Sequence, residues 1–549
     1  MDRPHVRPLF EPSPCDIDSQ EAPITSLRSS HIGGAAEVWT PIVRCRAPFP
    51  IELFETAVEQ LVHHPEYNSS LILRSEILSD VQCVQSPPGF LESRDRDSVF
   101  KQTELCSFDG YRSSRMMHRR LLPRRPGRDR SLEQTCVLYT AITQDLGSVL
   151  SLLVLTPFLR EGEMLPYYHP AVKRLACPCS PSTPASVPLQ PQPPDPNSRL
   201  YRTCLSLLDA VHRYGWGALT HYRKRVHHDC LIPREEYQDL YLVLRERYKY
   251  LVDMWKEATD PVKHVFEDIG IATFLILLWK ATYGCSGRVP THDSVADAPW
   301  RNWPRPPGGF LDLGCGNGLL THILVSEGYT GHGIDVRARQ SWSHYPDTTK
   351  KALHVFSLDP TCYIDGDCMI TTATKEEYLK PDVFLIGNHA DELTPWVSVL
   401  ATLCDAGGYL SIPCCAWGFD ERFTRTSSLP FSSTLSSLAP VIGQEDPDIN
   451  DVTFIESLNL GAEGSHKSQY SAYRIWLAQL SLRMGWKVEC EVLRIPSTRN
   501  WGLVGRERLY HDDSGDVEVY KHRAREIIVE VVRRGVFKTR KPEGRAGGH

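Results

Sequence analysis

From residue 309 onward, short apolar runs typical of strands alternate with segments whose apolar residues recur at helical spacing. Parallel strands need such helical crossovers, so this alternation predicts an α/β domain with a doubly wound, parallel or mixed sheet of about seven strands. We expect strands near 309–313, 332–336, 382–387, 409–412, 486–494 and 526–533, and helices from Gly318, from Asp391 and over 468–484.

The chain has 549 residues, which is too long for one hydrophobic core. Residues 177–198 contain eight prolines and few bulky apolar groups, a composition typical of a linker. Further on, Asp260 and Pro261 have the residue types of an N-cap and a first helical position, and they mark the start of a helix. We therefore expect an N-terminal α/β domain over 1–176 and a Pro-rich linker over 177–198. A helical segment over 199–300 should pack on the alternating α/β domain, which covers 301–535 with an insertion at 416–465. A basic tail follows over 536–549.

The composition favours a soluble, cytoplasmic protein. Apolar runs such as "IGIATFLILLW" are shorter than the roughly 20 residues that span a bilayer, and the N-terminus lacks the pattern of a secretory signal. The 17 cysteines show no paired C-x-x-C pattern, which argues for reduced thiols and against a zinc module. The net charge of −6 gives no global sign of a nucleic-acid partner, so any such surface has to be local.

The most informative motif is "GGFLDLGCGNGLL", which lies at the expected turn between the first strand and the first helix of the sheet. In open α/β sheets ligands bind at this edge. Gly314, Gly316 and Gly318 are spaced G-x-G-x-G, so Leu319 takes the place of the third glycine of a dinucleotide motif. Asp312 precedes them, and Asp335 follows Gly318 by 17 residues at the end of the next expected strand. Two carboxylates there suit a cationic, hydroxylated ligand; the alternative is a tight turn that binds nothing.

This version of the motif resembles motif I of class I S-adenosylmethionine-dependent methyltransferases. The resemblance implies a Rossmann-like fold, with Asp312 near the methionine ammonium, the three glycines near the methionine and ribose, and Asp335 on the ribose hydroxyls. Asp367 or its neighbour Asp365 is expected to face the adenine, with a solvated loop acid as the alternative. Asn388, which follows the strand expected near 382–387, is also assigned to the cofactor site.

A more specific resemblance rests on several segments together. They are "FLDLGCGNGLLTHILVSEGYTGHGIDVRARQSW", "LIGNHADELTPW", "IPCC", "KSQYSAYRIWL" and "RIPSTRN". With weaker upstream matches they cover roughly residues 110–175 and 235–535, and they resemble the eukaryotic tRNA (uracil-2′-O-)-methyltransferase family that modifies uridine 44 of serine tRNAs. The resemblance implies S-adenosylmethionine as cofactor and a serine tRNA as substrate.

A ribose 2′-hydroxyl is a poor nucleophile at neutral pH, so its methylation benefits from alignment and from help in removing the proton. The candidates for that base are His389 and Asp391. Lys467 and Arg499 are candidates for phosphate or hydroxyl contacts. Each has a structural alternative: Asp391 as a helix N-cap, His389 as a packing residue and Lys467 as a solvated surface residue. The lysine and carboxylate tetrad of K-D-K-E ribose methyltransferases is not evident.

Positive charge is concentrated in two places. Eight arginines lie between Tyr111 and Arg130, and they form either an RNA-binding run or a disordered basic loop. A second basic run, 532–545, could also contact tRNA or be a frayed tail. The arginines of the first run are Arg112, Arg115, Arg119, Arg120, Arg124, Arg125, Arg128 and Arg130.

Three functions remain open from the sequence. The first is a tRNA ribose 2′-O-methyltransferase, and the second is a methyltransferase with another RNA or protein acceptor. The third is a nonenzymatic RNA-binding scaffold, against which the glycines and the acid pair argue.

Overall fold

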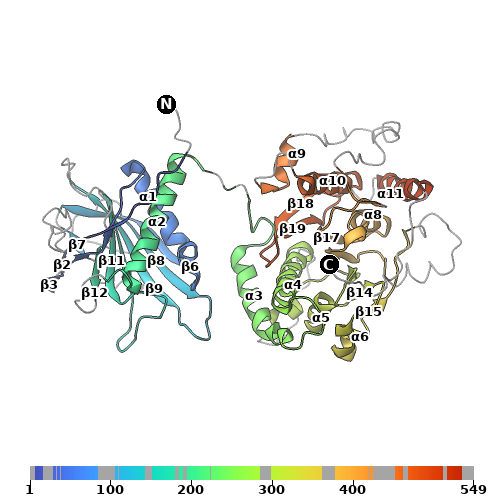
Figure 1. Ribbon diagram of the computed structural model, residues 1–549, viewed down its shortest axis with the longest axis horizontal. Coiled ribbons are helices and arrows are strands. Elements are labelled where there is room, and N and C mark those ends of the chain that lie inside the picture. Colours follow the sequence, from blue (N-terminus) through green and yellow to red (C-terminus); the bar gives the residue numbers. More distant parts are fainter. Residues whose placement is uncertain are drawn as a thin grey trace. The chain divides into compact units, whose positions relative to one another are not determined.

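The computed structural model divides the chain into two compact units, Met1–Arg223 and Lys224–His549 (Figure 1). Each unit is described by itself. The residues described are 6–15, 29–31, 34–37, 39–83, 106–108, 110–142, 151–179, 185–188, 195–222, 224, 226–284, 298–360, 378–419, 421–424, 452–461, 468–510 and 516–534.

The N-terminal unit is built on a seven-stranded, fully antiparallel sheet with the order β4-β12-β11-β10-β9-β8-β6. Two helices, α1 (Phe54–His63) and α2 (Arg199–Leu219), share one hydrophobic core with strand residues such as Met117 and Leu153. The separate α/β domain expected at the N-terminus is thus confirmed. The strands are β4 (Thr40–Pro41), β6 (Ile72–Gln82), β8 (Tyr111–Pro123), β9 (Leu132–Ala141), β10 (Ser151–Pro157), β11 (Val172–Cys179) and β12 (Ala185–Pro188). Small sheets pair β1 (Ser13–Pro14) with β5 (Val43–Arg44), and β2 (Ser29–His31) with β3 (Gly34–Glu37) and β7 (Ser107–Phe108).

The expected domain boundary at 177–198 is wrong. Strand β11 continues through Cys179, and β12 adds a further strand to the same sheet within the proline-rich stretch. Helix α2, expected to pack on the catalytic domain, instead contributes Tyr201, Cys204 and Leu208 to the N-terminal core. Prolines are tolerated near the edge of a sheet, where fewer backbone N–H groups must pair. The proline content therefore assigned to a linker residues that belong to the sheet.

The arginine run is not a disordered basic loop, because most of it forms β8. Arg119 is only 4% exposed, and its guanidinium donates to Gln134 Oε1 and to the carbonyl of Val62. Arg115 pairs with Asp80 and Glu59, and Arg120 pairs with Glu133. The exposed arginines of the run are Arg112, Arg124, Arg125 and Arg128, the last three in the turn between β8 and β9.

The C-terminal unit contains a seven-stranded mixed sheet with the order β15-β14-β13-β16-β17-β19-β18. The first five of these strands run parallel, whereas β19 is antiparallel to both of its neighbours. The α/β domain with a mixed sheet of about seven strands, expected from the alternating pattern, is confirmed. The strands are β13 (Phe310–Leu313), β14 (Gly331–Asp335), β15 (Leu353–Val355), β16 (Phe384–Asn388), β17 (Gly408–Ile412), β18 (Glu489–Val492) and β19 (Trp501–Gly505).

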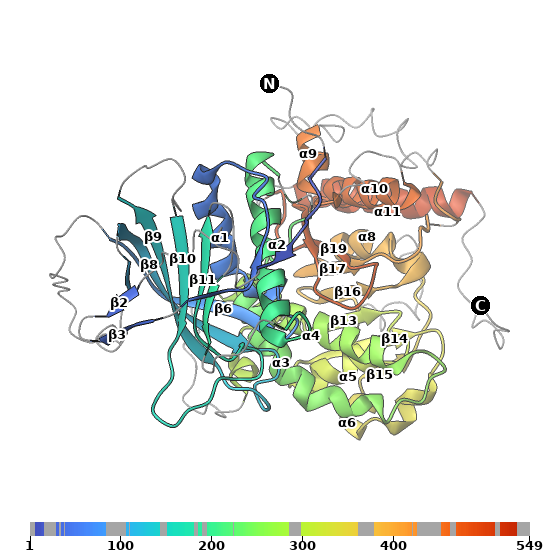
Figure 2. The ribbon, with the colours of Figure 1, turned by 60° about the vertical axis from the view of Figure 1, so that its left-hand side comes forward.

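Successive residues of a buried strand point to opposite faces of the sheet. Helices cover both faces, so two helical layers enclose the sheet (Figure 2). Leu311 and Leu385 pack in one core with α8 (Trp396–Leu403), α10 (Gln469–Arg483) and α11 (Asp516–Arg533). Phe310 and Phe384 pack in the other core with α3 (Arg234–Tyr248), α4 (Pro261–Tyr283) and α5 (Leu319–Ser326). Shorter elements are α6 (Asp347–Lys350) and α9 (Val452–Ser457).

Helix α4 begins as expected, because the Asp260 side chain accepts hydrogen bonds from the backbone N–H groups of Val262 and Lys263. The strand expected at 526–533 is wrong: this segment ends helix α11. Its β-branched residues suggested a strand, but the buried positions Tyr520, Ala524, Ile527 and Val531 recur at helical spacing. The last strand of the sheet is instead β19. No helix among the described residues combines the length and apolar character required to cross a bilayer.

Candidate active site

The glycine-rich turn after β13 adopts a conformation that needs glycine. Gly314, Gly316 and Gly318 have φ angles of 70°, 53° and 75°, in the left-handed region that side chains disfavour. The backbone N–H groups of Gly314 and Cys315 both donate to the carbonyl of Ile334 on β14, which fixes the turn against the sheet. A Cβ on Gly318 would lie 2.9 Å from Leu353 Cδ1, whereas one on Gly316 would meet nothing within 4 Å. Gly318 therefore serves packing, and Gly316 borders open space.

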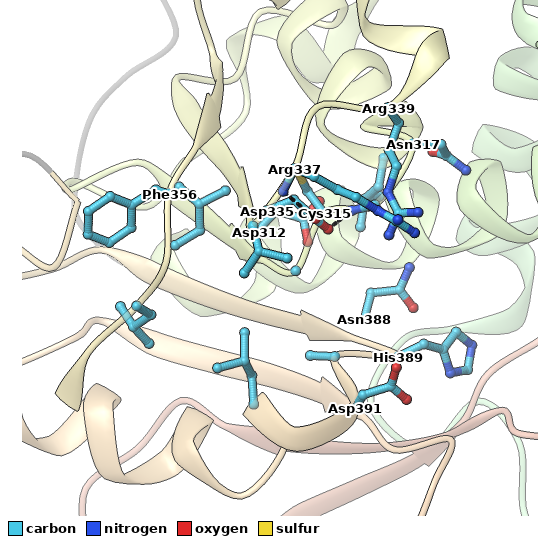
Figure 3. Close-up of a pocket in the computed structure, with 18 of the residues that line it drawn as sticks. Asp312, Cys315, Asn317, Asp335, Arg337, Arg339, Phe356, Asn388, His389 and Asp391 are labelled. Carbon is cyan, nitrogen blue, oxygen red and sulfur yellow. Dashed lines mark hydrogen bonds between the residues drawn. The ribbon is translucent and has the colours of Figure 1, made fainter. Parts of the chain in front are cut away.

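That open space is a cavity of about 300 Å³ at the carboxyl ends of β13, β14 and β16 (Figure 3). Most of the sequence candidates line it: Asp312, Gly314, Gly316, Asp335, Asn388, His389 and Asp391. Gly318 does not line the cavity, because it faces Leu353. Arg499 is also absent from the lining, and its guanidinium lies 3.8 Å from the ring centroid of Tyr470. Asp365, Asp367 and Lys467 fall outside the described residues.

Asp335 is held rigidly by the backbone. Its Oδ2 accepts from the N–H of Gly316 at 3.0 Å, and its Oδ1 accepts from the N–H of Arg337 at 3.2 Å. A carboxylate has about four acceptor positions, so those that remain can accept hydroxyl groups of a ligand. The side chains of Arg337 and Arg339, which directly follow β14, also line the cavity (Figure 3).

Asp312 has an oxygen that the described residues leave without a partner. Its Oδ2 accepts from Thr321 Oγ1 at 3.0 Å, while its buried Oδ1 has no hydrogen bond. Burial raises the pKa of Asp312 to about 7, against the opposing effect of the Thr321 hydrogen bond. A buried acceptor without a partner is costly, so this site fits a ligand that brings a cationic donor.

Helix α4 supplies three lining residues that the sequence analysis did not identify: His264, Glu267 and Asp268. Glu267 Oε1 lies 3.1 Å from His389 Nε2, and Asn388 Nδ2 donates to Asp268 Oδ1 at 3.4 Å. The sequence carried one signal for them. Glu267 and Asp268 are adjacent acids at the start of the part of α4 that is buried from Glu267 to Trp279, and acids are rarely buried without a partner or a function.

The segment after β16 is strained. His389 and Asp391 have φ angles of 52° and 46°, which are uncommon for residues with side chains and are often found at functional sites. The alternative role of Asp391 as a helix N-cap is not seen: it begins the short 3-10 helix η9 (Asp391–Leu393), and α8, expected from Asp391, begins only at Trp396. Instead, Asp391 Oδ1 accepts from Cys414 Sγ at 3.3 Å.

Asp391, Cys414 and Cys415 place one donor atom each within 4.8 Å of one another, a spacing that a soft metal ion could bridge.

The cavity itself combines a glycine turn open to a ligand, two acids on adjacent strand ends and an imidazole. The acids and the glycine turn suit a ligand that is both cationic and hydroxylated. The imidazole would then serve as a base near the reactive end of that ligand.

Two family models match the chain. One, described as "TRM44-like, N-terminal bet v1-like domain", matches residues 14–225, and this agrees with the boundary after Arg223. The other, described as "Predicted AdoMet-dependent methyltransferase", matches residues 231–295 and 301–360, which include the glycine turn, Asp312 and Asp335. Fold, site and match together define the C-terminal unit as that of an S-adenosylmethionine-dependent methyltransferase.

Similar proteins from fungi identify the family within this class of methyltransferases. The chain is 34% identical to the tRNA (uracil-O(2)-)-methyltransferase of Schizosaccharomyces pombe over 86% of each chain. It is 33% identical to that of Neurospora crassa, covering 91% of this chain and 92% of the relative, and 32% identical to that of Aspergillus oryzae, covering 83% and 80%. The chain belongs to the tRNA (uracil-O(2)-)-methyltransferase family, with S-adenosylmethionine as methyl donor. No solved structure shows a significant match.

Proposed function

We propose that this protein methylates the 2′-hydroxyl of a tRNA uridine, and that this nucleotide is uridine 44 of serine tRNAs. The main support for this reaction is the cavity, because the glycine-rich turn after β13 and the candidate base His389 both line it. The tRNA acceptor is supported by the names of the fungal relatives. The choice of serine tRNA and position 44 follows from the family resemblance of the segments between Phe310 and Asn500.

In this proposal Asp312 Oδ1 accepts from the ammonium of S-adenosylmethionine, and Asp335 accepts from its ribose hydroxyls. Gly314 and Gly316 allow the backbone to approach the cofactor, and the side-chain oxygen of Asn388, buried and without a hydrogen bond in the described residues, offers a further acceptor. Asp367 would face the adenine. When bound, the cofactor supplies a methyl group already activated on a sulfonium.

His389 is the proposed base. Its ring lines the cavity, and a neutral imidazole can accept the proton of a hydroxyl group as that oxygen becomes nucleophilic. Asp391, two residues further along, faces the same cavity and would orient the acceptor nucleotide by accepting a hydrogen bond.

Cofactor affinity should depend on pH through Asp312. Its pKa is raised to about 7 by burial, so a proton occupies it below that pH. An ammonium ligand favours the carboxylate, so the affinity rises with pH and is expected to be about tenfold weaker at pH 6 than at pH 8. Titration calorimetry across this range measures the effect. Asp312→Asn should bind weakly at every pH, and a variant that keeps the wild-type pH slope would contradict the assignment.

The exposed turn of the N-terminal unit is the proposed tRNA contact. Arg124, Arg125 and Arg128 are exposed there, and the neighbouring loop, joined to it by the Arg130–Glu163 ion pair, presents Tyr167 with 69% of its surface exposed. Arginines displace counterions from phosphates, and an exposed aromatic ring can stack on an unpaired base.

Replacing Arg124, Arg125 and Arg128 with glutamine should weaken tRNA binding and reduce the slope of log K against log salt by about one unit per lost phosphate contact. Binding assays at several salt concentrations measure this slope. The control replaces three other exposed arginines, Arg44, Arg46 and Arg112, with the same change in charge. Equal slopes for the two triple variants would remove the turn from the interface.

The reaction itself is tested with total tRNA from cells that lack the endogenous activity. The purified protein and labelled S-adenosylmethionine should produce 2′-O-methyluridine as the labelled nucleoside, found in serine tRNAs after fractionation. Label on a base, on another tRNA or on protein would contradict the proposed acceptor.

A further inference from the structure

We propose that Glu267 is the positioning residue of His389: it fixes the tautomer in which Nδ1 is the proton acceptor, and it stabilises the imidazolium formed during the reaction. This inference rests on the proposed function. It adds a residue from helix α4 to a site otherwise built from the strand ends of the sheet.

The geometry sets the tautomer. Glu267 Oε1 lies 3.1 Å from His389 Nε2, and the Glu267 side chain is only 5% exposed. An ionised carboxylate can only accept hydrogen bonds, so Nε2 must carry the proton. Nδ1 then keeps its lone pair. It is buried and has no hydrogen bond among the described residues, and a hydroxyl group entering the cavity would supply the missing donor.

Hydrogen bonds to Glu267 keep it ionised. Burial raises the pKa of Glu267, but the hydrogen bonds from His389 and from the hydroxyl of Ser497 contribute to lowering it below the ordinary value. The adjacent Asp268 behaves in the opposite way, because burial and the charges of Glu267 and Asp312 raise its pKa well above the ordinary value. The negative charge is thus concentrated on the carboxylate that contacts His389.

The backbone holds the ring in place. His389 has a left-handed φ of 52°, and its N–H donates to the carbonyl of Ile412 on β17 at 3.0 Å. Such a conformation is unfavourable for a residue with a side chain and persists when surrounding contacts determine it. The hydrogen bonds to Glu267 and to β17 are two contacts that do so.

The O–H bond of the acceptor ribose breaks and an N–H bond forms at Nδ1 of His389. The oxygen electron pair forms the new O–CH₃ bond, and the pair of the broken S–CH₃ bond stays on sulfur as a neutral thioether. The imidazolium, held by the Glu267 carboxylate, returns its extra proton to water.

The first test needs no activity. In protein labelled with ¹⁵N at the histidine rings, the signals lost in His389→Gln identify this residue, and its shifts should report a proton on Nε2 and none on Nδ1. In Glu267→Ala the preference should be lost. A wild-type ring protonated on Nδ1 would overturn the proposal, even if the protein proves to be a tRNA methyltransferase.

The second test compares Glu267→Gln with the wild type and with Glu236→Gln, which removes an exposed carboxylate of α3 that pairs with Lys280 of α4. Glu267→Gln should lower kcat at least about tenfold, with unchanged affinity for tRNA and cofactor. Glu267→Asp should restore part of kcat, because it returns a carboxylate to the same position. A Glu267→Gln enzyme with wild-type kcat would overturn the proposal, whereas an inactive wild type would contradict the proposed function instead.

Discussion

Replacing His389 with glutamine is expected to lower kcat for tRNA methylation by about 100-fold or more, while the dissociation constant for S-adenosylmethionine changes little. Loss of a general base commonly costs 10²–10⁴-fold in rate. Glutamine fills similar space and can still donate to Glu267, but it cannot accept the proton of a ribose hydroxyl at neutral pH. Single-turnover kinetics with saturating tRNA would measure the chemical step directly.

His522→Gln is the matched control, because His522 is 59% exposed on α11 and its pairing with Glu526 lies on the helix surface. It should retain wild-type kcat. A His389→Gln enzyme with more than about half of the wild-type rate would show that alignment alone drives the reaction and that His389 is a packing residue.

The second large effect is expected at Asp335. Asp335→Ala should weaken cofactor binding by about 1.5–3 kcal/mol, which corresponds to about 10- to 150-fold in the dissociation constant. Two losses combine: the acceptor for the cofactor's ribose hydroxyls disappears, and the N–H groups of Gly316 and Arg337 lose the carboxylate that orders the turn. Calorimetry on the purified variant gives the value.

Asp347→Ala controls for the loss of one negative charge shortly after β14, since the Asp347 side chain is 89% exposed and its pair with Lys350 lies on the surface. Its cofactor affinity should equal that of the wild type. Equal affinities for Asp335→Ala and the wild type would move the cofactor away from this turn.

That the proposed cofactor residues lie together at one edge of the sheet could be predicted from the sequence, because their position depends on local order along the chain. A strand, a glycine turn and a helix are contiguous, so Asp312, Gly314 and Gly316 fall at the edge of the sheet wherever the rest of the chain goes. Asp335 and Asn388 end neighbouring strands of the same parallel sheet, and this places them at the same edge.

What the sequence did not reveal depends on long-range packing. Glu267 and Asp268 come from a helix that ends well before β13, and nothing in local spacing indicates that α4 crosses the carboxyl ends of the strands. The same limit affected the arginine run. Alternation along β8 buries Arg119 and leaves other arginines exposed, and the pairing of β8 with β6 and β9 determines which arginines are buried. In α11, β-branched residues favoured a strand, but packing against α8 holds them in a helix.

The most direct measurement uses two serine tRNAs assembled from synthetic pieces, identical except that one carries 2′-deoxyuridine at position 44. With the wild-type protein and labelled S-adenosylmethionine, the ribose form should take up one methyl group per tRNA at that nucleotide, and the deoxy form should take up none. Equal incorporation into both tRNAs would contradict the claim that this cavity presents its methyl donor to the ribose hydroxyl of uridine 44.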